Sequence, residues 1–119
     1  TVLSTDKYRR LVEAAQRRGY EVRLIYVILQ SADLNVERVW LRVQKGGHNV
    51  PAGKVRERWT RSLHQLPWFL NRADWALIFD NSKELRVIGR KQDGVVVLDP
   101  TAPADVRKAV EKIRSAKTS

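Results

Sequence analysis

The feature that most restricts the fold is a run of six apolar residues from Leu24 to Leu29. The run does not alternate with polar residues, so it predicts a strand that is covered on both faces rather than one. Strands of this kind are typical of parallel sheets. A second mostly apolar segment, from Asp74 to Phe79, lies beyond an intervening helical region. Buried strands that alternate with helices predict an α/β fold.

Apolar spacing predicts helices on either side of these strands. A first amphipathic helix is expected over Thr5 to Arg18, with Ser4 or Thr5 as its N-cap and Gly19 as its end. The later segments are a helix from Ser31 to Val43, a helix from Pro51 to Leu66 that Pro67 breaks, a hairpin of Leu85–Arg90 and Val95–Leu98, and a helix from about Pro103. In the second helix, Val36, Val39, Trp40 and Val43 form an apolar face that is expected to be buried.

Length and composition limit the class of protein. A chain of 119 residues with 43% hydrophobic content suits one domain, here residues 1–119. There is no Cys or Met and there are two His, so neither disulfides nor a metal site are expected. No apolar stretch reaches the roughly 20 residues of a membrane span, and no signal peptide is visible. We therefore expect a soluble, cytoplasmic protein without membrane contact. The missing initiator Met suggests a piece of a longer chain.

The net charge of +10 and the pI near 10.5 predict an anionic partner, either nucleic acid or a phosphorylated small molecule. Arginines occur in every predicted helix and no basic tail is present, which weakly disfavours a dedicated nucleic-acid arm. Charge alone does not separate these two classes.

Arginine pairs flank a glycine-rich loop between the second and third predicted helices. Arg38 and Arg42 are spaced i, i+4, and Arg58 and Arg61 are spaced i, i+3, so each helix carries a like-charged pair on one face. Such a pair costs a few tenths of a kcal/mol, which an anion between the helices would offset. Simple solvation of the arginines is an equally good interpretation of the spacing. The intervening Gly46 and Gly47 end the second helix.

This segment resembles a known family. Its motif is Gly46-Gly47-His48-x-Val50-Pro51, followed by Arg56-x-Arg58-Trp59-x-Arg61-Ser62. Together with the first strand and Asp80-Asn81-Ser82, it is similar to the C-terminal half of the zeta-toxin-like P-loop kinases, over residues 1 to about 90. The resemblance implies a three-layer, mainly parallel sheet with a helical lid at about residues 36–66. It also implies phosphoryl transfer from ATP to a hydroxyl, such as that of a nucleotide sugar.

The resemblance assigns roles to particular residues. It implies that Arg42, Arg58 and Arg61 neutralise charge on the transferred phosphoryl group, which is the main catalytic need of this chemistry. The implied nucleotide-binding residues are Gly46, Gly47, His48 and Asn81, and the implied substrate-side residues are Thr1 and Ser4. From the residues alone, Asp80-Asn81-Ser82 follows a strand where α/β sheets bind ligands, but an ordinary turn is the favoured interpretation.

The chain departs from that family in one major respect, because it contains no phosphate loop of the form Gly-x4-Gly-Lys-Ser/Thr. ATP and Mg²⁺ are therefore expected for an intact enzyme, and no tight binding is expected for this chain alone. An antitoxin protein is a possible partner. The strand Val22 to Leu29 would have an unpaired edge, which predicts a homo-oligomer. The alternative function is a free-standing basic module that binds nucleic acid or a protein partner.

Overall fold

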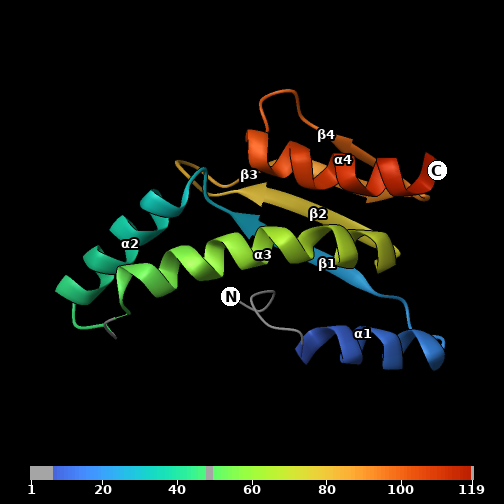
Figure 1. The fold of residues 1–119 in the computed structure, drawn as a ribbon, viewed down its shortest axis with the longest axis horizontal. Helices are drawn as coiled ribbons and strands as arrows, with labels where there is room; N and C mark the ends of the chain where they lie inside the picture. Colours follow the sequence, from blue (N-terminus) through green and yellow to red (C-terminus); the bar gives the residue numbers. More distant parts are fainter. Residues whose placement is uncertain (1–6, 48–49, 119) are drawn as a thin grey trace.

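The structure, a computed structural model, describes residues 7–47 and 50–118, with side chains described as far as residue 112. Within these residues the elements are α1 (Lys7–Arg17), β1 (Arg23–Ile28), α2 (Ala32–Gln44), α3 (Ala52–Arg72), β2 (Trp75–Asp80), β3 (Arg86–Gln92), β4 (Val95–Leu98) and α4 (Ala104–Thr118). The strands form one sheet in the order β1-β2-β3-β4 (Figure 1). The predicted α/β fold is confirmed.

The sheet is mixed. Strand β1 runs parallel to β2, whereas β2 with β3 and β3 with β4 are antiparallel. The prediction of a mainly parallel sheet is wrong, because the connections after β2 are too short for the crossover that a parallel pair requires. The β3–β4 turn has positive φ at Asp93 (52°) and Gly94 (78°), as a tight two-residue hairpin turn demands.

The described helices cover one face of the sheet, so the architecture has two layers rather than the expected three. The core lies between this face and the long helices α3 and α4 (Figure 1). On the opposite face, Ile25 and Val27 of β1 are 55% and 53% exposed. The expectation that Leu24 to Leu29 is covered on both faces is therefore wrong. An apolar run indicates that a strand is favoured to be buried, but it does not indicate which element or which chain buries it.

Helix α3 continues through Pro67, contrary to the prediction that it ends there. A proline inside a helix removes one backbone hydrogen bond and costs about 3 kcal/mol. The turns on either side place Leu66, Phe69 and Leu70 in the core, each at most 4% exposed. Burial of such side chains contributes about 1.5–3 kcal/mol apiece, which outweighs the proline.

The C-terminal end of α3 is held by Lys91 of β3. This side chain is only 5% exposed, and its Nζ donates to the carbonyl oxygens of Leu70 (2.7 Å), Asn71 (3.1 Å) and Ala73 (2.7 Å). A cation at this place satisfies carbonyl groups that the end of a helix leaves without intrahelical donors. The hydrogen bonds tie the helix to the sheet.

The shorter helices end where the glycines predict. Gly19 and Gly46 have φ of 82° and 93°, which is the left-handed conformation that glycine tolerates at a helix end. In α2, however, no residue is fully buried and Trp40 is 58% exposed. The expected burial of its apolar face is therefore wrong for Trp40, because α2 projects beyond the sheet and contacts mainly α3.

Candidate functional site

Helix α2 and the N-terminal part of α3 extend beyond the carboxyl ends of the parallel strands β1 and β2 (Figure 1). An ion pair between Arg56 Nη2 and Asp33 Oδ1 (2.8 Å) joins the two helices. The indole nitrogen of Trp59 donates to the carbonyl of Leu29 at the end of β1 (3.3 Å). These contacts fix the arginine-bearing helices relative to the edge of the sheet where open α/β folds bind ligands.

The segment Asp80-Asn81-Ser82 forms a tight turn at this edge. The buried Asp80 carboxylate accepts from the backbone N–H (2.9 Å) and the hydroxyl (2.5 Å) of Ser82. The hydroxyl oxygen of Ser82 accepts in turn from the N–H of Gln30 (2.8 Å), and the Asn81 N–H donates to Ile28 (2.9 Å). The turn interpretation agrees with this geometry. The half-buried Asn81 lies within the turn.

Arg38 connects the arginine helix to this turn. Its Nη2 donates to the carbonyl of Ser82 (2.6 Å). Beside it lies a cavity of about 450 Å³, lined by Gln30, Asp80, Ser82, Lys83, Glu84, Leu85 and Arg86. This volume falls within the range of small-molecule sites. The turn, the cavity and the base of the helix pair therefore form one candidate site.

The three arginines proposed as catalytic differ in their surroundings. Arg42 on α2 and Arg58 on α3 are exposed, and neither has a hydrogen-bond or ion-pair partner among the residues that the structure describes. Arg61 forms an i, i+4 ion pair with Glu57 on α3. The structure thus places all three on the helix pair, and no described contact unites them. Arg42 and Arg58 are the two that are available to an anion.

Gly47 packs closely against Arg42. Its N–H donates to the Arg42 carbonyl (3.0 Å), and a Cβ at this position would lie 3.0 Å from that oxygen and 3.1 Å from Arg42 Cγ. A larger residue at this position would therefore crowd the Arg42 carbonyl and stem, which would have to move by a few tenths of an ångström. The remaining predicted site residues, His48, Thr1 and Ser4, lie outside the described residues.

Sequence reasoning assigned no role in this site to Gln30 or Arg38, nor to the cavity-lining residues Lys83, Glu84, Leu85 and Arg86. Gln30 binds Ser82 through its backbone, so its residue type carried no signal. Arg38 was noted only as half of a charged pair, and its i, i+4 spacing from Arg42 is the signal that places both on one face.

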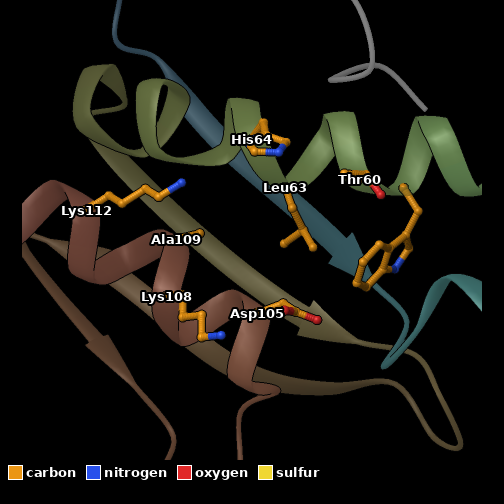
Figure 2. A pocket seen from close by; sticks show the side chains of 8 residues that line it. Thr60, Leu63, His64, Asp105, Lys108, Ala109 and Lys112 are labelled. Carbon is orange, nitrogen blue, oxygen red and sulfur yellow. The ribbon is translucent and has the colours of Figure 1, made fainter.

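A second cavity lies between α3 and α4 (Figure 2). It has a volume of about 220 Å³ and is lined by Trp59, Thr60, Leu63, His64, Asp105, Lys108, Ala109 and Lys112. Thr60 and His64 also line an adjoining hollow of about 490 Å³ with Gly53, Arg56, Glu57 and Arg61. The two hollows share Thr60 and His64 of α3, and their combined lining residues are called the basic groove below.

Neither a metal-ligand cluster nor a membrane-crossing helix is present in the part of the chain that the structure describes. No group of three or more His, Cys, Asp or Glu side chains there has the arrangement to hold a metal ion. None of its helices combines the length and the apolar character that crossing a bilayer requires.

Comparison of the chain with protein-family models, curated proteins and solved structures finds no match.

Proposed function

We propose that this chain forms the lid and the adenine-binding side of a nucleotide site in an ATP-dependent phosphotransferase. The observation that carries the proposal is the hydrogen bond from Arg38 to the Ser82 carbonyl (2.6 Å). It joins the arginine helix to the turn that follows β2, so that two segments distant in the sequence share one site. The resemblance to zeta-toxin-like kinases assigns the same two segments to the lid and to the adenine edge.

The charges of the helix pair support phosphate as the ligand. Arg38 and Arg56 are already engaged with protein groups, whereas Arg42 and Arg58 are exposed and have no described partner. Guanidinium groups bind phosphate oxygens in a bidentate manner and stabilise the charge that develops during phosphoryl transfer. In this proposal Arg42 and Arg58 bind phosphate, and Asn81 lies beside the base.

The described residues fit the nucleotide better than they fit a magnesium ion. The Asp80 carboxylate is 2% exposed and occupied by Ser82, and its second oxygen lies 3.6 Å from Arg86. Magnesium prefers carboxylate and water oxygens in an open octahedral site. No step of the proposal therefore relies on metal coordination by this chain.

A nucleotide titration followed by backbone NMR tests the proposal. We expect ADP and ATP to shift the amide signals of Arg42, Arg58 and Asn81. Two charge-assisted hydrogen bonds of about 1.5–3 kcal/mol each correspond to roughly millimolar affinity. The double substitution Arg42→Ala with Arg58→Ala removes the shifts.

Arg107→Ala serves as the matched control, because Arg107 is an exposed arginine on α4 that lines none of the cavities described above. It leaves the titration unchanged. Nucleotide-induced shifts that survive the double substitution, or that cluster elsewhere, contradict the proposal.

The basic groove across α3 favours one second candidate, the binding of nucleic acid. Lys108 and Lys112 lie on one face of α4, and His64 lies opposite them on α3 (Figure 2). Two lysines spaced i, i+4 repel each other, and binding to successive phosphates of a nucleic acid would relieve that repulsion. Nucleic-acid affinity that falls steeply with salt, with a slope reduced by about one for each lysine replaced by Ala, would favour this function. Unchanged affinity in those variants would exclude this groove as the contact surface.

A further inference from the structure

The face of the sheet opposite the helices is apolar and uncovered within the described residues. Its side chains alternate with those of the core along β1, β2 and β4, and β3 interrupts the alternation at a bulge opposite Ile78 and Phe79. The exposed side chains include Ile25 (55%), Val27 (53%), Val87 (40%) and Val97 (56%). An antiparallel sheet that faces water normally shows polar residues on that side. The exposed side chains of this face are instead mostly apolar.

The strand register makes the face continuous. Ile25 pairs with Leu77, Leu77 with Arg90, and Arg90 with Val97, so this row crosses all four strands. At about 4.8 Å per strand the row is roughly 14 Å wide. Val27, Phe79 and Val87 form a parallel row beside it. Contiguous apolar surfaces of this kind mark interaction sites.

Arg90 indicates which kind of partner would bind this face. It lies between Leu77 and Val97 within the apolar row, and it has no hydrogen-bond or ion-pair partner in the described part of the chain. Covering the row would bury this charge, which is strongly unfavourable unless the occupant supplies a carboxylate. The other arginine on this face, Arg23, is already paired with Glu21 (3.2 Å).

A second copy of the chain does not meet this requirement. The described strand residues on this face include no acidic side chain, so a second copy stacked face to face would place no carboxylate opposite Arg90. A helix is the standard cover for a sheet that contains a parallel pair. About 14 helical residues span the roughly 20 Å length of a six-residue strand.

We propose that the open face of the sheet docks an acidic amphipathic helix of a partner protein. Its apolar stripe packs on Ile25, Leu77, Phe79 and Val97, and one of its carboxylates pairs with Arg90. This surface is distinct from the nucleotide site, because it lies on the opposite side of the sheet from α3. The proposal does not depend on the function proposed above.

Two synthetic helical peptides with the same leucine stripe test the proposal, one flanked by Glu and the other by Lys. We expect the Glu peptide to bind and to shift the amide signals of β1 to β4, and the Lys peptide not to bind. Arg90→Glu should weaken the Glu peptide at least about 30-fold, as loss of a buried charge pair does, and should allow the Lys peptide to bind. Arg107→Glu, an equal charge change on α4, leaves both peptides unaffected.

Three outcomes overturn the proposal. The first is binding of neither peptide, and the second is equal binding of both with no effect of Arg90→Glu. The third is a dimer, detected by sedimentation, that Val97→Asp dissociates, because a second copy would then cover the face. Val97→Ser is the milder companion variant. It adds no charge to the face and should weaken Glu-peptide binding without unfolding the sheet.

Discussion

The phenol of Tyr26 and the hydroxyl of Ser62 are joined by a 2.5 Å hydrogen bond that connects β1 to α3 inside the core. Tyr26 is 5% exposed and Ser62 is 9% exposed. Burial raises the pKa of the Tyr26 hydroxyl to about 12, and the Ser62 hydrogen bond opposes this shift in part. Strand β1, which lies at one edge of the described sheet, is thus attached to the helix layer by a polar contact as well as by packing.

The raised pKa predicts a loss of stability at alkaline pH. The pKa of a tyrosine in the unfolded chain is about 10. Below this pH, Tyr26 is protonated in both the folded and the unfolded state, and its full contribution to the free energy of unfolding is present. Between about pH 10 and 12 the unfolded state releases the proton first, so the free energy of unfolding falls by up to about 1.4 kcal/mol per pH unit. Urea unfolding at several pH values measures this slope. Tyr26→Phe should have a shallower slope, and equal slopes would contradict the assignment.

Loss of either lid arginine should impair catalysis in an active phosphotransferase that contains this chain. Arg42→Ala or Arg58→Ala is expected to lower the catalytic rate by roughly 10³-fold or more, as loss of a transition-state arginine does. Steady-state kinetics measures the effect, and the unfolding midpoint checks that the fold is unchanged. Arg107→Ala should retain full activity. Near-normal turnover of both lid variants would remove the lid assignment.

The chain alone should neither hydrolyse ATP nor bind it tightly. Tight binding requires the oriented N–H groups and the Lys of a phosphate loop, and this sequence contains no such motif. Calorimetry with Mg-ATP is the measurement. A micromolar dissociation constant would show that the two arginines and the turn after β2 are not the whole site.

The free edge of β1 should pair with a second copy of the chain. Because the Ile28 carbonyl accepts from Asn81, the alternation of a parallel ladder directs the backbone groups of Ile25 and Val27 away from β2. An apolar edge without proline or charge is a template for pairing. Sedimentation equilibrium should detect a dimer that Val27→Pro dissociates, since proline removes one outward N–H.

Val27→Thr is the control for this edge, because it retains the N–H and the branched shape. It should leave the dimer intact. A chain that stays monomeric at all accessible concentrations would exclude edge pairing, and a dimer insensitive to Val27→Pro would locate the contact elsewhere.

Two glycine substitutions should change stability in opposite directions. At Gly89 in β3 an added Cβ would lie 2.6 Å from Leu98 Cδ2 and 3.2 Å from Ile78 Cδ1, so Gly89→Ala should cost about 1–3 kcal/mol. At Gly53 in α3 a Cβ meets nothing within 4 Å. Gly53→Ala should therefore stabilise the helix by about 0.5–1 kcal/mol. Chemical denaturation measures both, and a stabilising Gly89→Ala would contradict the packing of the hairpin.

The sequence by itself determined the elements and most of their ends. Apolar spacing defined the helices. Gly19 and Gly46 ended helices as predicted, and the predicted hairpin formed with a tighter turn at Asp93-Gly94, because positive φ is a local property of the chain. Tertiary structure decided the rest. Pro67 remains helical because the residues around it are buried, and one face of the apolar β1 stays exposed because no other described element packs on it. The bond from Arg38 to Ser82 spans 44 residues, and no local spacing encodes such a distance.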